Sequence, residues 1–392
     1  MTSRTDSPEF HAWLLAIAVP IIGLFFLPHL IFFWLIFVGW FIYKQFLTLA
    51  IAVPIIGLFF LPHLIFFWLI FVGWFIYKQF LATKLLDARG KAVFVTGCDS
   101  GFGLMIAEQL HSLGCTVFAG CLRPDGPGAR QLRNLTSDRI KILDLDVTDK
   151  EKIENCANTI EQYCNENKGG LWALVNNAGI AMAGEVEFVP LDEYKRSMEV
   201  NCWGPVAVTK SVLPLIRNAK GRVITITSGI ARCVQPGRSP YCMSKSALEA
   251  FCDCLRYEMQ KFGVKVITIT PGNLTGVTNI FDFLGRHFDE TIVPNIPQRI
   301  LRDYGRPYVD AFRSSIIGSS DGYRSQGSSL PAQLVINAIR DASLSDSPRV
   351  RYHPAQLTWP IWWFICGLLP ADITDKCQTY WQRNLPKPAS CQ

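Results

Sequence analysis

The chain has 392 residues, of which 49% are hydrophobic, and a formal net charge of +6. This length suits one large domain with appendages. The basic residues form no long run and do not alternate with aromatic residues, which argues against a nucleic-acid-binding protein. The 13 cysteines lack the spacing of metal ligands, and their odd number favours free thiols in a reducing compartment, so we expect no metal site.

The first feature along the chain, after a polar tail of residues 1–12, is a duplicated hydrophobic segment. Leu15–Leu47 recurs without a change as Leu49–Leu81. Each copy exceeds the roughly 20 apolar residues that a helix needs to cross the hydrocarbon core of a membrane. No small-residue cleavage site of a signal peptide follows. We therefore expect residues 13–82 to be a membrane anchor of transmembrane helices in contact with lipid. A recent duplication or an error of sequence assembly explains the identity of the two copies at least as well as function does.

Residues 83–350 have the composition of a soluble domain in which short β-rich runs alternate with amphipathic helical stretches. The predicted strands are Ala92–Thr96, Thr116–Ala119, Ile140–Leu143, Trp172–Asn176, Arg222–Thr227 and Lys265–Thr270. Predicted helices include Leu104–Leu113, Lys150–Asn165, Val206–Arg217 and Ser244–Phe262. Apolar strands separated by helices predict an α/β fold, a doubly wound Rossmann parallel sheet with helices on both faces. A ligand binds such a sheet at the carboxyl ends of its strands.

The regular alternation ends after Pro271. Residues 273–330 combine apolar residues with the polar stretch Ser314–Ser329, which suits a mobile lid or substrate loop; a surface insertion without a role in binding is the alternative. The last segment, residues 351–392, is expected to be an apolar, membrane-associated tail. Its run Leu357–Leu369 is rich in tryptophan but too short to span a membrane. This run is expected to lie on the membrane, to cover the mouth of the site or to form a buried helix.

A glycine-rich turn, Thr96–Gly103, follows the first predicted strand and opens a helix. Glycines permit a tight turn and let backbone N–H groups approach a pyrophosphate at the positive end of the helix. The turn therefore predicts a dinucleotide site that includes Gly97, Asp99, Ser100, Gly101, Phe102 and Gly103. The residues that end the second strand and follow it, Ala119–Arg123, lack the acidic residue that would favour NAD, and Arg123 comes late for a phosphate ligand. These residues alone leave the choice between NAD and NADP open.

Two further motifs at strand ends extend the predicted dinucleotide site. Asp146 can accept a hydrogen bond from the adenine amino group while Val147 covers the ring. The fourth strand ends in Asn176 followed by Asn177, Ala178 and Gly179, whose small and amide side chains let a dinucleotide lie close.

The predicted chemical centre is Ser228, Tyr241 and Lys245. Tyr241 and Lys245 are four residues apart and therefore share one face of a helix. A tyrosine has an ordinary pKa of about 10, and a nearby ammonium group is expected to lower it. Ser228 can bind the substrate oxygen and stabilise charge on it. In this hypothesis Tyr241 exchanges the hydroxyl proton while a hydride moves to or from a nicotinamide.

Together these motifs resemble the short-chain dehydrogenase/reductase superfamily over residues 91–280. TGCDSGFG, LWALVNNAG, SPYCMSKSALEAF and the closing RYHP and LPKP are similar to a narrower group, over residues 91–388. That group contains retinol dehydrogenases, oxidising 17-beta-hydroxysteroid dehydrogenases and D-beta-hydroxybutyrate dehydrogenase. The resemblance implies that Asn201 holds a water that links Lys245 to solvent, and that Pro271, Gly272 and Thr275 contact the nicotinamide end. Members mostly use NAD and also lack the second-strand acid, so the resemblance implies NAD rather than NADP.

Three hypotheses about function follow. The first is an enzyme that interconverts a lipophilic steroid or retinoid alcohol with its ketone or aldehyde, anchored in the endoplasmic reticulum with a cytosolic catalytic domain. The second is a 3-hydroxybutyrate dehydrogenase of the mitochondrial inner membrane, whose substrate carboxylate needs a cation such as Arg286, Arg299, Arg302 or Arg306. The third, a non-catalytic dinucleotide-binding membrane scaffold, has no need for the intact Ser228, Tyr241 and Lys245. The oligomeric state stays open, a homodimer included.

Overall fold

The computed structural model describes residues 31, 34–35, 63, 65–74, 84–135, 137–272, 280–324, 330–355 and 358–391. Internal contacts divide the chain into two units, Met1–Ala82 and Thr83–Gln392. Within the described parts of the chain, no helix is both long enough and apolar enough to cross a membrane. Most of the expected anchor lies outside the described residues, so its transmembrane helices stay a prediction.

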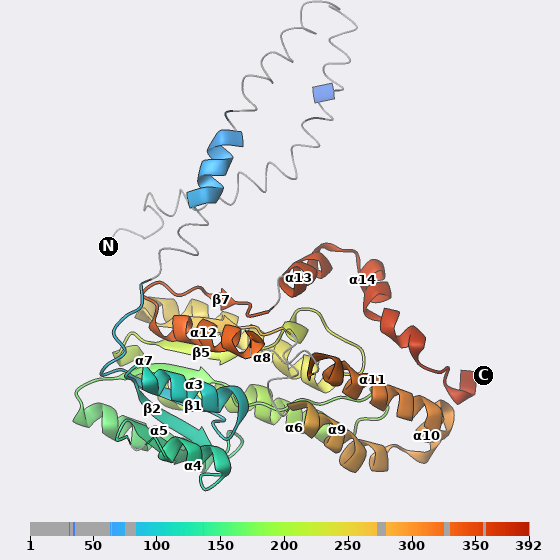
Figure 1. The fold of residues 1–392 in the computed structure, drawn as a ribbon, viewed down its shortest axis with the longest axis horizontal. Coiled ribbons are helices and arrows are strands. Elements are labelled where there is room, and N and C mark those ends of the chain that lie inside the picture. Colours follow the sequence, from blue (N-terminus) through green and yellow to red (C-terminus); the bar gives the residue numbers. More distant parts are fainter. Residues whose placement is uncertain are drawn as a thin grey trace, which may run out of the picture. The chain divides into compact units, whose positions relative to one another are not determined.

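The second unit is built around a seven-stranded parallel sheet with the order β3-β2-β1-β4-β5-β6-β7 (Figure 1). The strands are β1 Ala92–Thr96, β2 Thr116–Cys121, β3 Ile140–Asp144, β4 Leu171–Asn176, β5 Arg222–Ile226, β6 Lys265–Ile269 and β7 Arg351–Tyr352. The first six confirm the predicted Rossmann sheet. β7 was not predicted, because two residues carry no periodicity, and it lies just after residue 350, where the domain was expected to end. The strand order reverses between β1 and β4, and a ligand crevice forms at such a switch point.

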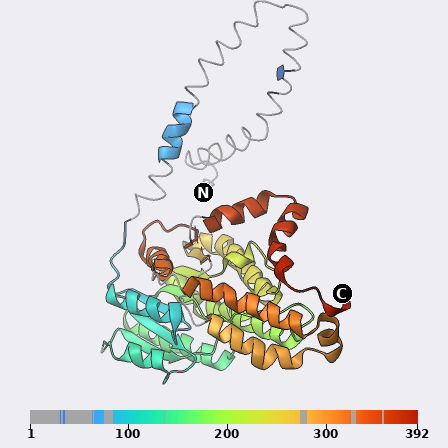
Figure 2. The same cartoon turned by 45° about the vertical axis from the view of Figure 1, so that its right-hand side comes forward.

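Helices cover both faces of this sheet (Figures 1 and 2). They are α3 Gly101–Ser112, α4 Pro127–Arg133, α5 Lys150–Glu166, α6 Leu191–Met198, α7 Gly204–Asn218, α8 Ser239–Met259 and α12 Leu330–Leu344. Alternate residues of β1 pack on opposite faces of the sheet. Val93 and Val95 belong to the apolar cluster formed with α3 and α12, whereas Phe94 belongs to the cluster formed with α5, α7 and α8. Burial on both faces is the reason why the strands read as continuous apolar runs.

The segment after β6 differs from the irregular lid that the sequence suggested. Its described residues are mainly helical, with α9 Ile280–His287, α10 Gln298–Tyr304 and α11 Arg306–Arg324. Val309 and Phe312, on one face of α11, are buried in a third apolar cluster with Phe288. Ser314 donates its hydroxyl hydrogen to the Asp310 carbonyl at 2.8 Å, inside the helix. The serine-rich composition hid this helix because serines that bond back to their own helix read as loop residues.

A buried cation ties the amino end of β5 to the far end of α12. Arg222 is 2% exposed and donates from Nη1 to the carbonyls of Ala342 at 2.9 Å and Ser345 at 3.0 Å. Its guanidinium lies 4.3 Å from the centre of the Trp172 ring, and burial lowers its pKa to about 10. A cation at the carbonyl end of a helix is stabilising because those carbonyls lack helical partners.

Candidate active site

The glycine turn between β1 and α3 has a geometry that favours glycines. Gly97 and Gly101 have φ angles of +72° and +58°. A Cβ on Gly103 would lie 2.0 Å from the Gly97 carbonyl oxygen. Ser100 makes no side-chain hydrogen bond to the first turn of α3, which leaves the N–H groups of that turn to an anionic ligand.

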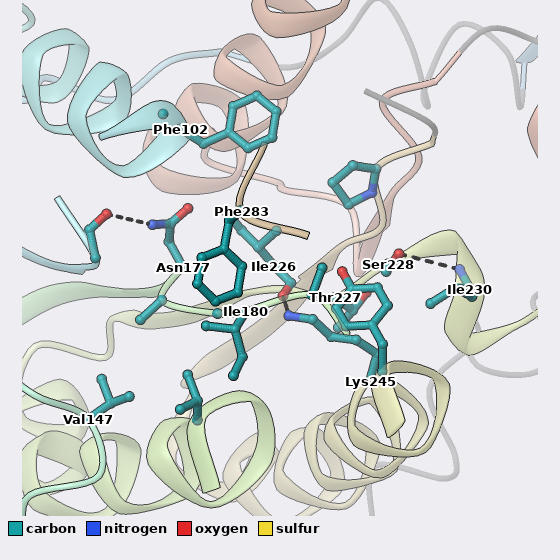
Figure 3. A pocket seen from close by; sticks show the side chains of 18 of the residues that line it. Phe102, Val147, Asn177, Ile180, Ile226, Thr227, Ser228, Ile230, Lys245 and Phe283 are labelled. Carbon is teal, nitrogen blue, oxygen red and sulfur yellow. Dashed lines mark hydrogen bonds between the residues drawn. The ribbon is translucent and has the colours of Figure 1, made fainter. Parts of the chain in front are cut away.

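A cavity of about 1030 Å³ runs from this turn to the end of β5 (Figure 3). Fourteen of the predicted cofactor-binding residues line it, namely Gly97, Asp99, Ser100, Gly101, Phe102, Asp146, Val147, Asn177, Ala178, Gly179, Tyr241, Lys245, Pro271 and Gly272. Gly103 and Asn201 are not on its wall, and Thr275 lies outside the described residues. The cleft that a dinucleotide would need is therefore present and is not filled by the protein's own side chains.

The carboxylate of Asp99 lies at the end of β2, where the sequence of that strand shows no acidic residue. It accepts hydrogen bonds from the backbone N–H groups of Leu122 at 2.9 Å and Arg123 at 2.8 Å. All three residues line the cavity. The sequence argument found no acid here because it considered the end of β2 alone, whereas this carboxylate comes from the glycine turn.

The two predicted motifs at the ends of β3 and β4 have different roles in the structure. Asp146 accepts hydrogen bonds from both the backbone N–H and the hydroxyl of Thr148, which fixes the loop after β3. Asn177 donates from Nδ2 to the carbonyls of Thr96 at 2.8 Å and Gly97 at 3.1 Å. Asn177 therefore holds the glycine turn in place as well as lining the cavity.

Ser228, Tyr241 and Lys245 meet at the other end of the cavity. Ser228 follows β5, accepts a hydrogen bond from the Ile230 N–H at 3.4 Å and is hydrogen-bonded to the Tyr241 hydroxyl. Lys245 lies one turn after Tyr241 on α8, with Nζ 5.9 Å from the centre of the phenol ring, and donates to the Ile226 carbonyl at 3.2 Å (Figure 3). The three side chains that the sequence singled out thus share one wall.

Burial dominates the electrostatics of this centre. It raises the pKa of the Tyr241 phenol, against the opposing effects of the Ser228 hydrogen bond and the positive charge of Arg238. It also lowers the pKa of the Lys245 amine to about 8. The prediction that Lys245 lowers the pKa of Tyr241 is therefore wrong, because burial raises this pKa. The amine is bonded to the Ile226 carbonyl, and its own charge is disfavoured by burial.

Arg238 is a site residue that the sequence argument missed. It is the N-cap of α8 and lines the cavity, and its charge acts on Tyr241. Burial lowers the pKa of its guanidinium. Its position three residues before Tyr241, one helical turn away, was the signal that could have identified it.

Asn201 lies behind the cavity wall in a short π-helix, Glu199–Trp203. Its Oδ1 accepts from the Ile180 N–H at 2.8 Å, and its Nδ2 donates to the Ile180 carbonyl at 2.9 Å and to the Ser244 hydroxyl at 3.0 Å. The side chain thus fixes the loop after β4 against α8. A π-helix inserted in a helix is often found at functional sites.

Comparisons with known proteins identify the family. A family model for short chain dehydrogenase matches residues 91–285. The D-beta-hydroxybutyrate dehydrogenase of rat mitochondria is 43% identical over 297 residues, which are 74% of this chain and 84% of the relative. This chain belongs to the short-chain dehydrogenase family.

Other relatives of this dehydrogenase act on larger molecules, according to their names. Human 17-beta-hydroxysteroid dehydrogenase type 6 is 38% identical, over 76% of this chain and 90% of the relative. Human retinol dehydrogenase 5 is 35% identical, over 78% and 92%. A crystal structure of a short-chain dehydrogenase from Streptomyces avermitilis is 26% identical and matches with a TM-score of 0.55, over 75% of this chain and 96% of that one. The dehydrogenase is accordingly an oxidoreductase that acts on CH–OH groups.

Among the residues that the structure describes, no group of three or more His, Cys, Asp or Glu side chains is placed to hold a metal ion.

Proposed function

We propose that this dehydrogenase interconverts a small hydroxy acid and the corresponding keto acid with NAD as the hydride carrier. The observation that carries the substrate class is the position of Arg238, a cation on the cavity wall whose charge acts on Tyr241. A guanidinium group is the usual partner of a carboxylate, which it binds with two parallel hydrogen bonds. A cation beside the predicted proton acceptor suits a substrate that carries a carboxylate close to its hydroxyl group.

A second arginine on the same wall supports this substrate class. Of the four cations that the sequence offered as carboxylate ligands, Arg286 lines the cavity. Arg299, Arg302 and Arg306 do not line it. We infer that Arg238 and Arg286 together make this end of the cavity cationic.

The residues present fit a dinucleotide, and the proposal favours NAD over NADP. Gly97, Ser100 and Gly101 of the glycine turn line the cavity, and the turn packs so closely on α3 that a side chain on Gly103 would clash with it. The Asp99 carboxylate, held at the end of β2 by two backbone N–H groups, can accept from a ribose hydroxyl. A 2′-phosphate at that point would meet a like charge, which costs affinity.

We infer the following roles for the protein groups in oxidation. NAD, when bound, supplies the acceptor for the hydride. Ser228 holds the substrate oxygen, and Tyr241 takes the hydroxyl proton. In reduction Tyr241 returns that proton to the carbonyl oxygen. Lys245 lines the cavity beside Tyr241 and binds the nicotinamide ribose. Asn201 acts as a positioning residue that keeps the loop of Ile180 against α8; whether it also holds a water beside Lys245 is part of this proposal.

A lipophilic alcohol, steroid or retinoid, is the second candidate substrate. Apolar side chains of Ile180, Ile230 and Phe283 also line the cavity. The C-terminal helix α13, Thr358–Leu368, exposes Phe364 by 68% and Leu368 by 69%. Exposed apolar residues of this size suit a lipid surface, from which such substrates partition.

We further propose that residues 13–82 anchor the enzyme in a membrane. The length and the apolar character of each copy support this placement. The endoplasmic reticulum with a cytosolic catalytic domain agrees with the lipophilic substrate, and the mitochondrial inner membrane agrees with the hydroxy acid. Imaging of the tagged full chain against markers for both membranes separates the two locations.

The substrate proposal is tested with the full chain in detergent, NAD, and a panel of 3-hydroxybutyrate, a neutral secondary alcohol, a steroid and retinol. For Arg238→Gln we expect the KM for 3-hydroxybutyrate to rise by roughly 10- to 100-fold, the worth of a charged hydrogen bond. The matched control Arg299→Gln, outside the cavity, should leave all rates unchanged. Turnover of steroid or retinol with none of 3-hydroxybutyrate would contradict the hydroxy-acid proposal and support the second candidate.

A further inference from the structure

All 13 cysteines are free thiols in this structure. Two of them are far apart in the chain and close in space: Cys233 and Cys366 are 133 positions apart in the sequence, and their sulfur atoms are 3.5 Å apart. Neither has a part in the chemistry proposed above. A pair of thiols at this distance is close to the geometry of a disulfide bond.

The pair joins the C-terminal helices to the wall of the active-site cavity. Cys233 lines the cavity, five residues after Ser228, and Cys366 lies on α13. Gln378, the last residue of α14 Ala371–Gln378, donates from Nε2 to the Cys233 sulfur at 2.5 Å. Both helices therefore contact the wall at one sulfur atom.

The two thiols differ in access to solvent. Cys233 is 7% exposed, whereas Cys366 is partly exposed. Burial and the hydrogen bond with Cys366 raise the pKa of Cys233 to about 11. An oxidant from solvent therefore reaches Cys366 first, and Cys233 is placed to react with the oxidised sulfur.

We propose that Cys233 and Cys366 form a reversible disulfide that fastens α13 to the wall of the active-site cavity when a peroxide is present. The Cys366 sulfur attacks the O–O bond of hydrogen peroxide, which gives a sulfenic acid and one water. The Cys233 sulfur then loses its proton and attacks the Cys366 sulfur, and the sulfenic oxygen leaves as a second water. The two thiols lose two electrons, and the peroxide gains them.

The bond requires a small movement and has a direct effect on the cavity. The sulfurs must approach by roughly 1.5 Å to reach the disulfide length of about 2.05 Å, which side-chain rotation on the exposed helix α13 can supply. The disulfide then joins the cavity wall at Cys233 to α13, so that neither can move without the other. Because a displacement of about 1 Å near a reacting centre costs up to about 100-fold in rate, we expect turnover to fall by roughly tenfold or more. This holds for either substrate class.

The test uses the full chain in detergent, exposed to hydrogen peroxide and then quenched with N-ethylmaleimide. Mass spectrometry of a non-reducing digest should find the Cys233 peptide linked to the Cys366 peptide, with two hydrogens lost. Turnover should fall and return after dithiothreitol. The yield of the linked peptide should rise as the pH rises toward 11, because the Cys233 thiol deprotonates.

Two variants separate this pair from the other thiols. Reduced Cys366→Ser should keep wild-type turnover and lose the response to peroxide. Cys377→Ser, which removes an exposed thiol on the neighbouring helix α14, should respond like the wild type. A missing linked peptide, an equal loss of turnover in Cys366→Ser, or a linked enzyme with unchanged turnover would each overturn the proposal.

Discussion

Replacement of Lys245 by methionine is expected to make the enzyme inactive and more stable at neutral pH. Lys245 is 4% exposed, and burial lowers its pKa from 10.5 to about 8. At about 1.4 kcal/mol per pKa unit, the charged amine destabilises the folded protein by about 3 kcal/mol. Methionine removes this penalty but leaves the Ile226 carbonyl without its donor, a loss of about 1 kcal/mol. A net gain of about 2 kcal/mol at pH 7 remains.

The sign of the pH dependence follows from the direction of the shift. Since the folded pKa lies below the unfolded one, the penalty is complete below pH 8, declines as the pH rises from 8 to 10.5 and is absent above that range. The stability gain of Lys245→Met should therefore fade over that same window.

Thermal unfolding of the full chain in detergent without cofactor, followed by circular dichroism at pH 7 and pH 10, measures this effect. We expect a rise in Tm of roughly 4–8 °C at pH 7 and a much smaller one at pH 10. Lys210→Met, at an exposed position on α7, is the matched control and should change little. A variant that is less stable than the wild type at pH 7, or equally stabilised at both pH values, would refute the reasoning.

Three further predictions concern the chemistry and the cofactor. Tyr241→Phe should lower turnover by about 100- to 10,000-fold, while NADH fluorescence titration gives an unchanged Kd. In the wild type, the rate of alcohol oxidation should still increase at alkaline pH, because burial raises the pKa of this phenol. A rate that levels off near neutral pH would contradict the raised pKa. Gly103→Ala should abolish NADH binding in the same titration, because its Cβ would lie 2.0 Å from the Gly97 oxygen; normal binding would mean that the turn tolerates a shift. Asp99→Asn should raise the ratio of kcat/KM with NADP to that with NAD by about tenfold, or about 1.4 kcal/mol, and an unchanged ratio would show that this carboxylate does not select the cofactor.

The sheet and most of the cavity wall could be predicted from the sequence because their signals are local. Five of the six predicted strands, all but β3, are largely buried on both faces, so each reads as an apolar run between turns. The glycine turn, Asn177 and the Tyr241–Lys245 pair could be recognised because short spacings along the chain define their geometry. β7 could not be found, because a two-residue strand is defined by its pairing with β6 rather than by its own pattern.

The features that could not be predicted from the sequence depend on contacts between distant segments. The acid at the end of β2 is supplied by Asp99 across the turn, and the balance of charges around Tyr241 depends on burial that no spacing reveals. The helices after β6 were taken for an irregular lid, since the apolar positions of α11 are separated by serines and make sense only once Phe288 packs against them. The roles of these residues remain proposals that the variants above can test.

The hydrogen bonds of Arg222 to the end of α12 affect how the substrate preference of this dehydrogenase can change. The proposed substrate loop, residues 273–330, lies between β6 and α12 in the chain, and the far end of α12 is hydrogen-bonded to Arg222 at the amino end of β5, away from the cavity. Insertions or replacements between these two fixed ends need not disturb the strands that shape the dinucleotide cleft. Exchange of residues 280–324, together with Arg238, for the corresponding residues of a relative named for a steroid substrate should therefore transfer substrate preference while cofactor preference stays with the host.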